Sequence, residues 1–116
     1  MLIQDTKTDI CTNRFGGNGD VIIEHYIEEK LLNDSVVMYA RVILKPGCSL
    51  GYHAHNGNSE TIVVLQGTAD YNDNGTPMTL HAGDKVHYPS GESHSIGNPA
   101  DAKEDLLLQA LVIKTN

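Results

Sequence analysis

The chain is divided into short runs of β-branched and aromatic residues, each of which ends at residues that favour turns. The runs span residues 21–27, 36–44, 61–65, 68–72, 76–81, 85–88, 93–97 and 105–113. Runs of this length suit strands better than helices. Only residues 27–32 and the final stretch, 106–113, also suit a helix, because periodicity does not separate a buried strand from a buried helix. Many short strands with turns between them predict an all-β sandwich or small barrel.

Two of the turns carry strong local signals. Pro46-Gly47 occupies the two residues that a type II turn prefers at its centre. Asn74-Gly75 is the pair most typical of a tight β-hairpin. These pairs place turns where the runs of β-forming residues end, which supports a meandering all-β chain.

The sequence of 116 residues has no internal repeat, low-complexity stretch or linker, so we expect one domain. Within it, residues 1–35 are expected to carry one strand and to serve as a dimer arm or as a lid over the mouth of the barrel. Residues 36–116 are expected to form the barrel itself. The stretch Gly16-Gly17-Asn18-Gly19 lacks the strand and helix context of a phosphate loop and is interpreted as a flexible turn or lid.

The charge balance limits the classes of partner. The chain has 8 Lys and Arg against 15 Asp and Glu, a net charge of −7, which disfavours binding to nucleic acid or to an anionic membrane. The N-terminus lacks the basic start and long apolar centre of a signal peptide, so we expect a cytoplasmic protein. Cys11 and Cys48 have no CxxC spacing and are expected to be free thiols.

The stretch GYHAHNGNSET, residues 51–61, contains the first candidate site. His53 and His55 lie two residues apart and share a face if the segment is extended. If residues 56–59 form a hairpin loop, Glu60 faces His55 across the strand pair. Two imidazoles and a carboxylate are ligands for first-row transition metals. The alternative is that these are surface side chains near an ordinary polar turn.

A second stretch, residues 83–98, supplies a fourth candidate. His94 and Ile96 alternate with serines, so both point to one face of a strand. Because Ile96 looks like a core residue, we expect His94 to point into the barrel as well. A buried histidine requires a polar partner, and a metal ion is one such partner.

The spacing of both stretches resembles that of the cupin superfamily. The first cupin motif, G-x5-HxH-x4-E-x6-G, is matched by Gly47, His53, His55, Glu60 and Gly67. The second motif, G-x5-PxG-x2-H-x3-N, is matched by a further set of residues: Gly83, Pro89, Gly91, His94 and Asn98. Residues 47–98 therefore look like a small single-domain metal-binding cupin.

The resemblance implies a double-stranded β-helix, that is, a conical jelly-roll barrel. It also implies one divalent transition metal ion per chain, held by His53, His55, Glu60 and His94. The ion is Mn, Fe, Ni, Co, Cu or Zn, and the sequence does not select among them. The alternative is a barrel in which these residues are only hydrogen-bonded core groups. Small cupins commonly form homodimers, and we expect one here, with residues 1–35 as the exchanged segment.

Other polar residues are candidates for catalysis or for substrate binding. Tyr88, Tyr52 and Glu92 are candidate catalytic groups, and Arg41 and Tyr71 are candidates to bind an anionic substrate. The remaining histidines have no spacing partner and are expected to lie outside the site: His25, His81 and His87. His87 in particular is expected to face away from the barrel if Tyr88 lines it.

The functional hypothesis is a metalloenzyme that acts on a small polar or anionic metabolite, with oxygenase, decarboxylase or isomerase chemistry. The alternative is a non-catalytic protein that binds or senses a small molecule through its metal. The resemblance extends loosely to oxalate-decarboxylase-like cupins. Decarboxylation is not inferred, because the decarboxylases of that family have two cupin domains and a lid glutamate with no assignable equivalent here.

Overall fold

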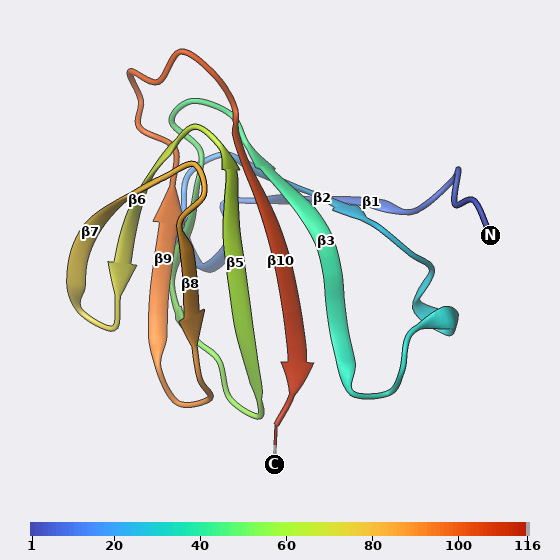
Figure 1. Cartoon of the computed structure of the whole chain (residues 1–116). Coiled ribbons are helices and arrows are strands. Elements are labelled where there is room, and N and C mark those ends of the chain that lie inside the picture. Colours follow the sequence, from blue (N-terminus) through green and yellow to red (C-terminus); the bar gives the residue numbers. More distant parts are fainter. Residues whose placement is uncertain (116) are drawn as a thin grey trace.

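The computed structural model describes residues 1–115 as two antiparallel β-sheets that face each other (Figure 1). The six-stranded sheet has the order β1 (Thr8–Thr12), β2 (Asp20–His25), β3 (Val36–Leu44), β10 (Leu106–Lys114), β5 (Asn58–Gln66) and β8 (Lys85–Tyr88). The four-stranded sheet has the order β4 (Ser49–Ala54), β9 (Ser93–Gly97), β6 (Thr68–Asp73) and β7 (Thr76–His81). This architecture confirms the predicted all-β jelly roll.

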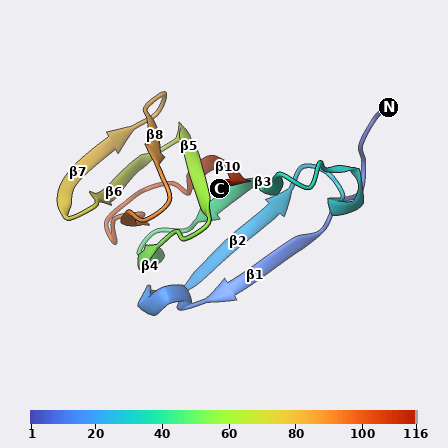
Figure 2. The same cartoon turned by 90° about the horizontal axis from the view of Figure 1, so that it is seen from below.

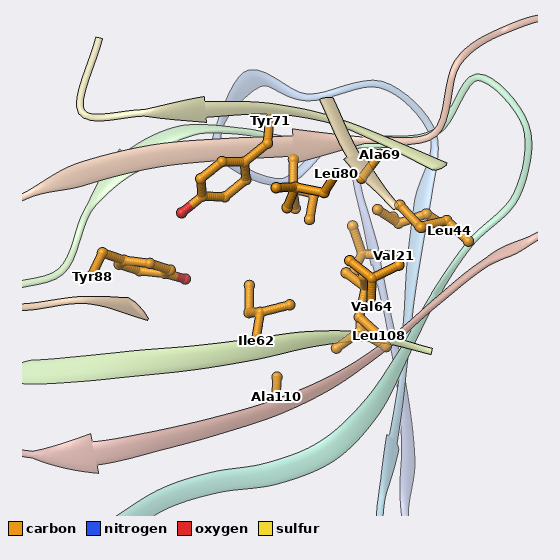
Figure 3. Packing of buried hydrophobic residues seen from close by; sticks show 13 residues of the cluster. Val21, Leu44, Ile62, Val64, Ala69, Tyr71, Leu80, Tyr88, Leu108 and Ala110 are labelled. Carbon is orange, nitrogen blue, oxygen red and sulfur yellow. The ribbon is translucent and has the colours of Figure 1, made fainter. Parts of the chain in front are cut away.

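Alternation along the strands builds the core between the two sheets. On β10, residues 106, 108, 110 and 112 are buried, and on β5 the residues 60, 62 and 64 are buried. The inner faces pack together as one cluster, shown in part in Figure 3: Val21, Val42, Leu44, Ile62, Val64, Ala69, Tyr71, Leu80, Tyr88, Ile96, Leu106, Leu108 and Ala110. The stretch at 106–113, which also suited a helix, is a strand because it has a hydrogen-bonded neighbour on each side.

Both strong turn signals are confirmed. Gly47 has a φ of +82°, and the Cys48 amide donates to the Lys45 carbonyl at 2.9 Å, as a type II turn requires. Asn74 and Gly75 have φ angles of +49° and +100° and connect β6 to β7. Two positive φ angles are the signature of the type I′ hairpin that this pair favours.

The expected hairpin between His55 and Glu60 is wrong. β4 pairs with β9 in the four-stranded sheet, whereas β5 pairs with β10 and β8 in the six-stranded sheet. The chain between β4 and β5 therefore crosses from one sheet to the other instead of reversing within one. The turn composition of residues 56–59 indicated a change of direction but not the partner of each strand, which distant residues supply.

The first 35 residues contain more regular structure than expected. β1 was not predicted, and it pairs with β2 to form a ribbon at the edge of the six-stranded sheet (Figure 2). Two short 3-10 turns follow the ribbon's strands, η1 (Arg14–Gly16) and η2 (Glu29–Leu31). Within residues 1–115, no helix has the length and apolar character needed to cross a membrane.

Candidate metal centre

Four polar side chains from both sheets meet at one end of the barrel interior. His53 on β4 is the register partner of His94 on β9, so these two imidazoles lie side by side in the four-stranded sheet. His55 follows β4 directly. Glu60 lies on β5 of the opposite sheet, on the same buried face as Ile62. Because the donors come from facing sheets, closing the sandwich is what brings them together.

The donor atoms are separated by distances typical of ligands around one ion. The Nε2 atoms of His53 and His55 are 3.3 Å apart, and those of His53 and His94 are 3.2 Å apart. A Glu60 carboxylate oxygen lies 3.2 Å from Nε2 of His55. With metal–nitrogen bonds of about 2.1 Å, two nitrogens on one ion are separated by roughly 3.0–3.4 Å. The three imidazoles, with ring nitrogens all within 4.8 Å of one another, fit this geometry.

Hydrogen bonds on the far side of two rings determine which nitrogen carries the proton. Nδ1 of His53 donates to the Gly51 carbonyl at 2.7 Å, and Nδ1 of His55 donates to the side-chain oxygen of Asn58. Both Nε2 atoms are then unprotonated in the neutral rings. Two such lone pairs cannot bond to each other at 3.3 Å, but a shared cation satisfies both. This pairing is the observation that best supports a metal ion.

The environment shifts the pKa values of the imidazoles in different directions. Burial, followed by the neighbouring His53 and His55, lowers the pKa of His94 to about 2. Burial also lowers the pKa of His53. The hydrogen bond to Glu60 raises the pKa of His55. Only neutral imidazole coordinates a metal, so the two lowered values favour the ligand form of the site.

These shifts predict how the metal-free protein responds to acid. The pKa of His94 falls on folding, so its contribution to stability is present above about pH 6.5 and is lost as pH falls toward its folded-state value. His55 acts in the opposite direction, because the stability from its raised pKa is lost as pH rises. We expect the lowered pKa values of His53 and His94 to outweigh the raised pKa of His55 in the pH dependence of stability. The urea midpoint of chelator-treated protein should therefore be lower at pH 5 than at pH 7.5.

A variant separates this contribution from the titration of other groups. His94→Phe keeps an aromatic ring beside Tyr88 but cannot take up a proton. We expect its urea midpoint to change less between pH 7.5 and pH 5 than that of the original protein. An equal change in both proteins would contradict the assignment to His94.

Two buried tyrosines contact the cluster of His53, His55, Glu60 and His94. The Tyr88 hydroxyl donates to a Glu60 carboxylate oxygen, and the Tyr88 side chain is fully buried. Tyr71 lies edge-on to His94 with ring centroids 5.7 Å apart, and its hydroxyl is buried and unpaired within residues 1–115. Burial raises the pKa of both phenols, so both stay protonated at neutral pH. In Figure 3 both rings project into the space between the sheets.

A cavity of about 440 Å³ opens beside this cluster. His53, His55 and Glu60 line this cavity, whereas His94 is fully buried and does not line it. The rest of the wall is mainly apolar and comes from both sheets, including Ile62 and Leu108 of the six-stranded sheet and Leu50 and Ile96 of the four-stranded sheet. A ligand in this cavity would contact the polar cluster at one end and aliphatic side chains elsewhere.

Several predicted candidates lie away from the cavity. Tyr52 is half exposed and alternates with His53, so its ring projects from the other face of β4. The Arg41 guanidinium is bonded to Glu24 at 2.6 Å on the outer face of the six-stranded sheet. Arg41 was a candidate to bind an anionic substrate, but the residues of β3 that point inward are its neighbours Ala40 and Val42. Because successive residues of a strand point to opposite faces, Arg41 points outward. Glu92 lies in the β8–β9 turn and does not line the cavity.

The three remaining histidines lie outside the site, as expected. His25 bonds to Asp9 at 2.9 Å and His81 lies on the exposed end of β7. His87 is exposed and bonds to Thr61 at 2.8 Å, which confirms that it faces away from the barrel.

The structure adds three residues that sequence reasoning did not assign. Asn58 binds Nδ1 of His55, and Arg14 and Phe15 line the cavity. The Phe15 ring stacks on the His53 imidazole with centroids 4.1 Å apart and an interplanar angle of 9°. The glycine-rich stretch after Phe15 had indicated a loop over the mouth, but nothing in its sequence showed which side chains it presents.

Comparison with known proteins identifies the family. The family model described as Cupin domain matches residues 40–108, which include all four clustered donors. The chain belongs to the cupin family. The match starts inside β3 and ends inside β10, so it spans both sheets of this cupin.

A curated Thermotoga maritima sequence and a Thermotoga maritima crystal structure resemble this cupin over most of its length. One is described as an oxalate-binding protein and is 36% identical over 102 residues, which cover 88% of this chain and 83% of the relative. The other is a crystal structure described as a predicted oxalate decarboxylase, with a TM-score of 0.89, 32% identity, and 99% and 100% of the two chains covered. A cupin barrel protein from Salinispora arenicola has a TM-score of 0.75 at 23% identity, covering 99% of this chain and 90% of that one, and so shares the fold.

Proposed function

We propose that this cupin binds one divalent transition metal ion and uses it to hold a small carboxylate in the barrel cavity. The proposed ligands of the ion are His53, His55, Glu60 and His94. The observation that carries this proposal is the close approach of the Nε2 atoms of His53 and His55, 3.3 Å apart, in rings whose Nδ1 atoms are each bonded to an oxygen of the chain. A metal ion there would supply positive charge and open coordination positions for anionic oxygens.

The surrounding residues support a role in holding the ion and its ligand. Tyr88 donates to one oxygen of Glu60 and so orients the carboxylate toward the imidazoles. Gly51 and Asn58 hold the rings of His53 and His55 in place. The mainly apolar wall of the cavity would lower the local dielectric around a bound ion, which would strengthen its attraction for an anion.

The relatives favour a small dicarboxylate as the ligand. One is described as an oxalate-binding protein. On the cavity wall, within residues 1–115, every imidazole and carboxylate belongs to the proposed donor set. Binding a ligand requires no further acid or base, so this composition favours retention of the ligand over its conversion.

A second candidate is the metalloenzyme, with oxygenase, decarboxylase or isomerase chemistry. The relative described as a predicted oxalate decarboxylase favours this candidate. The proposed set of only four protein ligands also favours it. Four donors leave open positions on a six-coordinate ion. Those positions would accept a substrate, and the tyrosine hydroxyl of Tyr88 would stay protonated beside it.

Calorimetric titration with oxalate tests the proposal. Protein stripped of metal with a chelator and protein reloaded with Mn²⁺, Co²⁺ or Zn²⁺ would be compared under the same conditions. We expect about one ion per chain and oxalate binding only in the loaded protein. Equal binding of oxalate by stripped protein would contradict a metal-held ligand. Carbon dioxide release or oxygen uptake in the same samples would favour the enzyme, and stable binding without product would favour the binding protein.

A further inference from the structure

The loop of residues 13–19 is seated against β4 with no space between the two backbones. A Cβ atom at Gly17 would collide with the Ser49 carbonyl oxygen, and one at Gly51 would collide with the Phe15 carbonyl oxygen. Asn18 adds three hydrogen bonds of 2.8–3.0 Å to Ser49 on β4 and to Gly47 in the turn before it. The loop therefore has a defined position over the mouth of the cavity, next to the strand that carries His53.

Phe15 is held in a conformation that phenylalanine rarely adopts. Its φ is +54°, in the left-handed region where a bulky side chain is strained. This backbone conformation directs the ring onto His53, where the two rings lie parallel at 4.1 Å. The ring is half exposed and also lines the cavity, so it stands between solvent and the proposed metal site.

Arg14 lies beside Phe15 on the cavity wall and carries a positive charge that no carboxylate of the described residues pairs with. Its guanidinium lies 4.9 Å from the centre of the Phe15 ring, and its other contact is a 3.4 Å hydrogen bond to the Cys11 sulfur. Within residues 1–115 Arg14 forms no salt bridge, whereas Arg41 is paired with Glu24. It is also the one Arg or Lys on the cavity wall of the described chain.

We propose that Arg14 and Phe15 select the ligand of this cupin, Arg14 by its charge and Phe15 by limiting the size of what reaches the metal. This inference rests on the proposed function, because it concerns ligands of the same cavity. The selected class is a small carboxylate anion that fits under the Phe15 ring and pairs with the Arg14 guanidinium. Neither residue belongs to the metal donor set, so both act on the choice of ligand and not on retention of the ion.

Ligand titrations of the Co²⁺-loaded protein, followed by the visible absorption of the ion, test this inference. Oxalate and phthalate are both dianions and differ in size, and imidazole is an uncharged metal ligand. The variants are Arg14→Gln and Phe15→Ala. The matched controls are Arg41→Gln, an arginine on the outer face, and Tyr52→Ala, an aromatic residue as exposed as Phe15 at 50% but outside the cavity.

Each variant should alter a different ratio of affinities. Arg14→Gln should weaken oxalate by about 10-fold, the loss of one charge-assisted hydrogen bond, and imidazole by less than about 2-fold. Phe15→Ala should favour phthalate over oxalate by about 10-fold relative to the original protein, because the size limit is removed. Both variants should retain stoichiometric Co²⁺, and the two controls should leave every affinity unchanged.

The outcomes separate the inference from the function on which it rests. Oxalate binding by the original protein with unchanged ratios in both variants overturns the inference alone. Equal weakening of oxalate and imidazole in Arg14→Gln also overturns the charge selection, since only a general distortion of the site would do this. Failure of the original Co²⁺-loaded protein to bind any of the carboxylates overturns the proposed function together with the inference.

Discussion

Replacement of His55 by alanine should lower the affinity for Co²⁺ or Zn²⁺ by at least about 100-fold. Changes to residues that merely orient metal ligands cost about 10- to 100-fold in affinity, and His55 is proposed to bind the ion itself. Its Nε2 atom lies between Nε2 of His53 and the Glu60 carboxylate, so its loss removes the donor that connects the two sheets. Competition with a chromophoric chelator measures the affinity directly.

The same variant should remain folded without metal. His55 lies at the rim of the barrel after β4 ends, and the apolar cluster between the sheets does not include it. We expect the free energy of unfolding of chelator-treated His55→Ala to fall by about 1 kcal/mol or less. An unfolded variant would indicate instead that the four residues are needed for folding, which would contradict a separable metal site.

His87→Ala is the matched control for the first prediction. His87 is also a histidine on a strand next to the site, but it is exposed and bonds to Thr61 on the outer face. Its removal should change neither the metal affinity nor the unfolding transition measurably. Loss of metal in both variants would place the ion elsewhere.

Replacement of Leu106 by alanine should have the largest effect on stability, about 3 kcal/mol, because a buried leucine is removed and a cavity is left. Leu106 is completely buried on β10, between the strands β3 and β5. For a chain of this length the change corresponds to a decrease in melting temperature of about 12 °C. Urea unfolding followed by circular dichroism, in the presence of chelator, measures it.

Leu65→Ala is the control for Leu106→Ala. Leu65 lies on β5 with 44% of its surface exposed, and its removal should cost less than about 0.5 kcal/mol. Because Leu106 does not line the cavity, the folded fraction of Leu106→Ala should still bind metal with the original affinity. Similar losses of stability in the two variants would contradict the buried cluster as the source of the fold's stability. Together the ligand and core variants test whether metal binding and folding are separable.

The sequence by itself determined the features that depend on neighbouring residues. Alternation along a strand predicted that His94 lies on the same face as Ile96, and both residues are buried. Turn chemistry located the bends at Gly47 and at Asn74-Gly75, where positive φ angles are needed. The all-β class and the polar residues that gather at one end of the barrel were therefore predictable from the order of residues along the chain.

Only the tertiary structure decided which strands are partners and which loop covers the site. His55 and Glu60 meet across the two sheets and not across a hairpin, because the partners of β4 and β5 are strands distant in sequence. The register of β3 turns Arg41 to the outer face of the sheet, and a register different by one residue would have turned it inward. Arg14 instead lines the cavity from the loop after β1. Local sequence sets the direction of a side chain within its own strand or turn. What that side chain meets is set by the packing of the whole chain.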